Sequence, residues 1–242
     1  MRLAGSPLGS LLLVSQLVGA CGSTTQTAPP PRERPAEAVC TLGADPAAHV
    51  GLLPPRLGAP ATVEPGASPL SLDITGDGTS EMVFVARTAS DRWLTVLGCQ
   101  DFAVTVLGAF KMPGLVGTVQ VEPFVATRSP VRELKVTLTA QDATSAQEFW
   151  AYFGFDGADL GQEFGWFASR VPPQGDASRA AITFVDEDGD GTNEIRIVEE
   201  ILEGNGARAR LTDTAAPLPR IQSVRTLRFR FDATRRTFGP VE

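Results

Sequence analysis

The sequence is poor in the residues that most enzymes use as nucleophiles and bases. It holds a single His, His49, and three Cys among 242 residues, and it lacks the G-x-S-x-G, H-E-x-x-H, P-loop and dinucleotide-binding motifs. A Ser–His or Cys–His catalytic pair is therefore not indicated. His49 has no Cys or acidic residue at ligand spacing, so we interpret it as structural. We predict a non-catalytic protein.

Positive charge and long apolar runs are also scarce. The formal net charge is −7, which argues against nucleic acid as a partner. The apolar run near the start, Leu8 to Val18, is 11 residues long and is interrupted by polar residues. A membrane-spanning helix needs about 20 apolar residues. The run is typical of a signal peptide that follows a positively charged Arg2.

The apolar run ends in Leu17-Val18-Gly19-Ala20-Cys21, which resembles the lipobox of bacterial lipoproteins. The resemblance implies that residues 1–20 are a signal peptide and that Cys21 carries a lipid anchor in the membrane. An ordinary secretory signal with a chance Cys is the alternative. Gly22, rather than Asp, follows the Cys. By resemblance to Gram-negative lipoproteins, this favours the outer membrane, with the periplasmic or surface face left open.

Residues 21–38 are rich in Pro and Thr and are predicted to be a disordered linker, followed by a folded domain at 39–242. Two Cys remain in that domain, Cys40 and Cys99. In an exported protein such a pair predicts a disulfide, although two separate buried thiols are the alternative. Residues 41–69 show no clear periodicity and are predicted to be an irregular lead-in.

Two acidic loops are the most informative feature of the sequence. The loop 186–194 carries Asp186, Asp188, Asp190 and Glu194, with Gly191 at the turn and Thr192 offering its carbonyl. Ca²⁺ prefers such oxygen ligands, and four neighbouring carboxylates need a cation. The loop 73–81 repeats the pattern with one carboxylate fewer, so we expect weaker binding there. Its candidate ligands are Asp73, Thr75, Asp77, Thr79 and Glu81.

A helix-loop-helix calcium site needs Glu at position 12, where these loops have Phe84 and Ile197. The ninth residue must then close the site, just before a strand. This arrangement resembles the FG-GAP or VCBS-type loops of integrin-like β-propellers, and the resemblance implies bound Ca²⁺. A solvated Asp/Gly turn that binds no metal is the alternative.

The loops belong to a repeat. Glu81, Glu133 and Glu194 are separated by 52 and 61 residues, and each precedes an alternating apolar segment. The middle copy has Ala126-Thr127-Arg128-Ser129-Pro130 in place of the acids. We predict an all-β fold of about three blade-like antiparallel units, at 70–115, 125–168 and 182–242. They would form a partial propeller or a sandwich-like assembly, because three blades are too few to close a propeller.

Residues after the second acidic loop are less clear. The segment from Ile195 fits a strand or a helix, and the loop resemblance favours a strand. Residues 203–219 are predicted to be a mobile inserted loop. Nearby arginines are interpreted as a solvated basic face rather than an anion site. These are Arg208, Arg210, Arg220, Arg225, Arg228 and Arg230.

The sequence thus predicts a calcium-stabilised, lipid-anchored binding module of the cell envelope whose protein or glycan ligand is unknown. One alternative is a calcium-stabilised hydrolase or sugar-processing enzyme that uses paired carboxylates. Another is a structural envelope protein that binds no metal.

Overall fold

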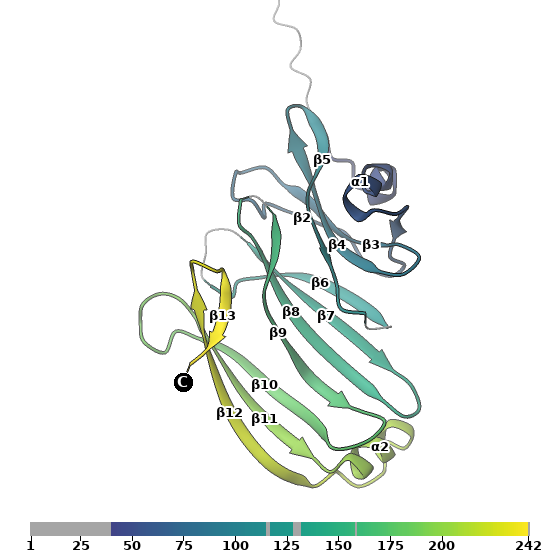
Figure 1. Cartoon of the computed structure of the whole chain (residues 1–242), viewed down its shortest axis with the longest axis vertical. Helices are drawn as coiled ribbons and strands as arrows, with labels where there is room; N and C mark the ends of the chain where they lie inside the picture. The colour runs from purple at the N-terminus through teal and green to yellow at the C-terminus, as the bar shows by residue number, and fades with distance from the viewer. Residues whose placement is uncertain (1–39, 115–116, 128–131, 158, 242) are drawn as a thin grey trace, which may run out of the picture. The chain divides into compact units, whose positions relative to one another are not determined.

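The fold consists of three four-stranded antiparallel units in chain order (Figure 1). The computed structural model describes residues 40–114, 117–127, 132–157 and 159–241. Unit one contains β2 (Leu70–Leu72), β3 (Glu81–Arg87), β4 (Arg92–Gln100) and β5 (Ala103–Lys111). Unit two contains β6 (Thr118–Phe124), β7 (Glu133–Gln141), β8 (Ala146–Phe155) and β9 (Leu160–Val171). Unit three contains β10 (Ala177–Val185), β11 (Glu194–Leu202), β12 (Ile221–Asp232) and β13 (Thr237–Pro240).

The first two strands of every unit meet in the same register. In each unit the last residue of the first strand pairs with the Glu that opens the second strand. The three pairs are Leu72 with Glu81, Phe124 with Glu133, and Val185 with Glu194. The loops between them are therefore equivalent, and a slip of one residue would move every side chain to the wrong face.

The strands form two open sheets. Unit one and β1 (Thr62–Val63) make a five-stranded sheet, and units two and three make an eight-stranded sheet. Units two and three are joined where β9 pairs with β10, a short match in which Ser169 and Arg170 face Arg179 and Ser178. The predicted all-β fold is confirmed. In the part of the chain that the structure describes, the strand orders do not close into a barrel, which favours the sandwich-like form of the prediction.

The core of the protein lies between the faces of successive units. Because side chains alternate along a strand, each central strand can bury apolar residues on both faces. Val83 and Val96 of unit one pack in one cluster with Leu134 and Phe153 of unit two. On the opposite face of β8, Tyr152 belongs to a cluster with unit three.

Aromatic rings dominate the contact between units two and three. Tyr152 lies 4.9 Å from Phe184, and Phe164 lies 5.1 Å from Phe229, measured between ring centroids. Both pairs have edge-to-face geometry, which suits the charge distribution of aromatic rings. Beyond this layer, the other face of unit three carries exposed Arg196 and other polar side chains.

The lead-in before unit one is partly helical. The 3-10 helix η1 (Pro46–Leu52) and the one-turn helix α1 (Pro54–Leu57) cover the outer face of unit one. Leu53 between them and Leu57 pack against Met82 and Phe84. The predicted lead-in thus contains short helical turns, which bury the apolar face that unit two leaves uncovered.

The segment 203–219 also differs from the prediction of a mobile inserted loop. It contains a helix, α2 (Gly204–Thr212). Arg208 secures the helix by donating from Nη1 to the carbonyl oxygens of Pro172, at 3.2 Å, and Gly175, at 2.9 Å. A Cβ at Gly204 would lie 1.8 Å from the Gly175 oxygen, so this close approach requires Gly.

No helix within the described residues is long and apolar enough to cross a membrane. The predicted signal peptide at 1–20, Cys21 and the linker at 21–38 lie outside the described residues.

A disulfide joins Cys40 to Cys99 across a sequence separation of 59 residues, with the Cα atoms 5.9 Å apart. It fastens the beginning of the lead-in to β4, and the predicted pairing is confirmed.

Replacing both Cys40 and Cys99 by Ala should lower the free energy of unfolding by about 2–4 kcal/mol, because the unfolded chain regains the freedom of a long closed loop. Denaturant titration under oxidising conditions measures this. As the control, reductant should weaken the natural protein to the level of the variant and leave the variant unchanged. Equal stability of the variant and the oxidised protein would contradict the prediction.

Candidate metal-binding loops

The three equivalent Glu residues close the three loops in the same way. Each carboxylate turns back and accepts a hydrogen bond from the backbone N–H seven residues earlier in the chain. The pairs are Glu81 with Ile74 at 2.8 Å, Glu133 with Ala126, and Glu194 with Glu187 at 2.8 Å. All three Glu residues are buried. A buried carboxylate needs such partners, so the Glu defines the loop whether or not the loop carries further acids.

Thr at the third position of a loop adds two hydrogen bonds to the closing Glu. Thr75 donates its N–H and its hydroxyl to Glu81, each at 3.3 Å. Thr127 makes the same two contacts with Glu133. In the third loop this position is Asp188, which is why the first and middle loops have a similar closure and the third differs.

The first acidic loop has a defined turn. One oxygen of Asp73 accepts from Gly76 N at 2.6 Å and the other from Gly78 N at 2.9 Å. Gly76 and Gly78 have φ values of 79° and 86°, a region that Gly enters without steric cost. Asp77 accepts from Thr79 N at 2.7 Å.

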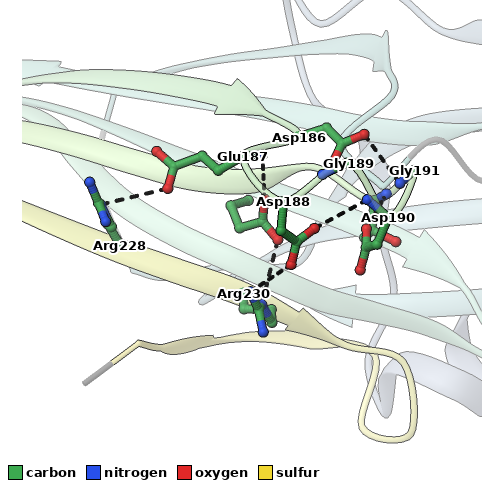
Figure 2. A network of polar contacts seen from close by, with 10 residues as sticks. Asp186, Glu187, Asp188, Gly189, Asp190, Gly191, Arg228 and Arg230 are labelled. Atoms are coloured by element: carbon green, nitrogen blue, oxygen red, sulfur yellow. Dashed lines mark hydrogen bonds and ion pairs between the residues drawn. The ribbon is translucent and has the colours of Figure 1, made fainter.

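The third loop has the same turn (Figure 2). Asp186 accepts from Gly189 N at 2.7 Å and from Gly191 N at 3.1 Å, and these glycines have φ values of 77° and 91°. Asp190 accepts from Thr192 N at 2.7 Å. The two acidic loops are therefore one local structure formed twice.

The loops bring three of the predicted carboxylate ligands together in each case. In the first loop, oxygens of Asp73, Asp77 and Glu81 lie within 4.8 Å of one another. In the third loop the equivalent group is Asp186, Asp188 and Glu194. Of the predicted carboxylate ligands, Asp190 is outside these groups and instead holds the turn. The oxygens of Thr75, Thr79 and Thr192 stay predicted ligands.

Burial and neighbouring negative charges both raise the pKa of Glu81. Burial raises the pKa of Glu81 above its ordinary value, and the nearby Asp77 and Asp73 charges raise it further. The N–H groups of Ile74 and Thr75 oppose this increase in pKa. A bound cation would relieve the repulsion among these carboxylates.

The third loop differs from the first in having arginine partners from β12. Arg230 Nη2 lies 2.7 Å from Asp188 Oδ2, and Arg230 Nε lies 3.5 Å from Glu194 Oε1. Arg228 Nε lies 3.6 Å from Glu187 Oε2. Figure 2 shows Arg228 beside Glu187 and Arg230 beside Asp188. These arginines were predicted to form a solvated face, and their contacts depend on a strand register that the sequence pattern did not reveal.

Among the described residues, no Arg or Lys side chain forms an ion pair with Asp73, Asp77 or Glu81. The two loops thus have similar turns but different electrostatic surroundings.

The oxygen-only ligand sets fit a hard cation such as Ca²⁺. In the third loop, Glu194 Oε1 is buried and accepts no hydrogen bond, and Arg230 Nε lies 3.5 Å from it as an ion-pair partner. A buried carboxylate oxygen that accepts no hydrogen bond, beside Asp186 and Asp188, is a suitable ligand atom. Three carboxylates would supply part of the six to eight oxygens that Ca²⁺ takes, with backbone carbonyls and water supplying the others.

The middle loop contacts the third loop directly. Asn193 Nδ2 donates to the carbonyl oxygen of Ala126 at 2.8 Å. Val125, which stands where the acidic loops have Asp73 and Asp186, is 51% exposed. The middle loop therefore keeps the closing Glu and a contact between units, without the acids.

Another buried carboxylate, that of Glu163, lies close to the middle loop. Glu163 of β9 receives a hydrogen bond from Arg236 Nη2 at 2.9 Å, while its Oε2 has no hydrogen-bond partner. Burial raises the pKa of Glu163 to about 7, and the negative charge of Glu133 adds to the increase. Arg236 lies between β12 and β13, so the ion pair joins units two and three. Neither residue belongs to a motif, so no sequence signal identifies them.

Comparison with known proteins finds no matching family model, no similar curated protein and no similar solved structure. The functional interpretation therefore depends on the geometry and chemistry of these loops.

Glu163 should make stability fall as pH rises. Its pKa is about 7 in the folded state against an ordinary 4.5, so the folded state binds more protons between these values. The contribution of Glu163 to stability is complete below about pH 4.5 and is lost as pH rises through 7, a change on the order of 3 kcal/mol. Glu163→Gln should remove this part of the pH dependence in unfolding titrations from pH 4.5 to 8. Glu122→Gln, at an exposed site, is the control and should leave the slope unchanged.

Proposed function

We propose that this protein is a calcium-stabilised, non-catalytic β-repeat module held at the cell envelope, where it binds a protein or glycan ligand. The observation that carries the proposal is the repeated turn around Asp73 and Asp186, each beside a buried Glu that opens a strand. The turn gathers carboxylate oxygens at the same place in two units. Ca²⁺ bound there would neutralise them and hold the loop against the adjoining strand.

The disulfide supports an exported location. Disulfides persist in oxidising compartments and are rare in the cytosol, and Cys40–Cys99 is in place in this fold. We therefore propose that residues 1–20 direct export, that Cys21 carries the lipid, and that residues 22–38 separate the β-repeat domain from the membrane. The proposed site is the outer membrane of a Gram-negative bacterium.

Arg230 gives specific support to one alternative, a structural envelope protein that binds no metal. Its guanidinium lies beside Asp188 and Glu194 and supplies positive charge to the third loop without an ion. The first loop has no such arginine among the described residues, so the need for a metal is greater there.

The enzyme alternative has less support. Glu163, with a pKa of about 7, has the protonation behaviour of a general acid. Its side chain is only 1% exposed, however, and is engaged by Arg236, so a substrate has no access to it in this structure. We interpret Glu163 as structural.

Calcium should stabilise the folded protein. At about 100 times the dissociation constant, an ion that binds only the folded state adds about 2.7 kcal/mol per site. Thermal unfolding in chelator and in millimolar Ca²⁺ measures the shift, which the combined Asp73→Asn and Asp186→Asn variant should lose. Asp142→Asn is the matched control, because Asp142 holds a similar turn through Thr144 N and Ser145 N but belongs to neither carboxylate group. Identical melting curves with and without Ca²⁺ would exclude the metal.

Lipid attachment should depend on Cys21. In cells that process lipoproteins, the natural protein should sediment with membranes and enter the detergent phase on phase partitioning, because its acyl chains anchor it stably. Cys21→Ser should move it to the soluble fraction. Cys99→Ala, at a Cys outside the lipobox, should remain with the membrane. Membrane retention of Cys21→Ser would contradict the lipid anchor.

A further inference from the structure

We infer that Arg230 is a built-in counter-cation that competes with Ca²⁺ for the third loop, so that the first loop binds the ion at lower concentration. This inference rests on the proposed calcium function and reverses the order of affinity that the carboxylate count predicts. Three observations carry it: the position of Arg230 in the repeat, its contacts, and its freedom to leave the site.

Arg230 occupies a position that is Gly in the other two units. Ile195 pairs with Phe229, so the next step of the antiparallel ladder places Arg230 opposite Glu194. By the same step from Leu134 with Phe153, Gly154 lies opposite Glu133. From Met82 with Leu97, Gly98 lies opposite Glu81. The third unit therefore carries a cationic side chain of its own at this position, where the other two units have Gly; in unit two, Arg236 from another segment lies near Gly154.

Neighbouring side chains explain why units one and two have Gly at this position, and the arginine is specific to unit three. A Cβ at Gly98 would lie 3.3 Å from Glu81 Cγ and 2.3 Å from Leu107 Cδ1. At Gly154 it would lie 2.1 Å from Glu163 Oε1. In units one and two this position is filled by neighbouring side chains, whereas unit three directs Arg230 toward the loop.

The contacts of Arg230 overlap the candidate metal ligands. Its Nη2 and Nε lie 2.7 Å from Asp188 Oδ2 and 3.5 Å from Glu194 Oε1, respectively. Glu194 Oε1 is buried and accepts no hydrogen bond, and its contact with Arg230 is longer than a hydrogen bond. A cation that uses these two oxygens must displace the guanidinium or bind beside it, and both options weaken its binding.

Arg230 can leave the site at modest cost. Its side chain is 58% exposed, on the face of unit three that carries exposed Arg196. The ion pair with Asp188 is exposed on both sides, and such pairs contribute little to stability. Glu194 is buried, but a bound ion would take over the neutralisation of its charge, so the guanidinium can turn into solvent when the ion binds. At low Ca²⁺ the arginine would neutralise the loop, and at high Ca²⁺ the ion would replace it. The third loop would then respond to Ca²⁺ concentration while the first stays occupied.

The test isolates the third loop and changes only its arginines. In an Asp73→Asn background, calorimetric titration with CaCl₂ gives the dissociation constant of the third loop. Arg230→Gln should lower this constant about tenfold, because it removes the competing charge. Arg230→Lys, which keeps the charge, should stay close to the parent. Arg228→Gln is the matched control on the same face of β12, since Arg228 pairs with Glu187 outside the carboxylate group.

The outcomes separate this inference from the proposed function. Calcium binding that is unchanged or weaker in Arg230→Gln would overturn the competition and leave the calcium proposal standing. The same holds if an Asp186→Asn protein, with only the first loop intact, binds more weakly than the Asp73→Asn protein. Absence of binding in the natural protein and in every variant would overturn both. Circular dichroism of each variant confirms that it is folded before titration.

Discussion

The return of a strand-opening Glu onto the backbone of the preceding loop is the interaction on which the rest of the structure depends. It sets the register of the first two strands in each unit, and the register decides which side chains face the neighbouring unit. The first and third loops carry further acidic residues besides the closing Glu, and the middle loop does not. The closure is therefore the common feature of the three units, and a metal would reinforce it.

The predictable part of the fold is the part with a local signal. The segments after Glu81, Glu133 and Glu194 have alternating apolar residues, from which the sequence predicts strands, and the structure has β3, β7 and β11 there. The first strand of each unit was missed. In β6 the alternation of Val119 and Val121 is interrupted by Pro123, and β2 has only three residues.

Other features depend on residues that are distant in the sequence. The helix α2 begins with Gly204-Asn205-Gly206, which has low helix propensity, and Arg208 secures it through contacts with residues 172 and 175. The contacts of Arg230 with Asp188 and Glu194 need the register of β11 and β12. The convergence of positions one, five and nine in the first loop, but one, three and nine in the third, needs side-chain geometry. Spacing alone could identify the ligand types but not the set that meets.

The disulfide has a mechanical consequence. Tension applied between the residues before Cys40 and the C-terminus passes from Cys40 through the sulfur atoms directly to Cys99 in β4. The segment enclosed by this covalent bridge, which includes both lead-in helices and the first acidic loop, cannot be extended by such a pull. The third loop lies beyond Cys99 and has no such protection. Under such a pull, the two acidic loops, which have similar turns, would therefore carry different loads.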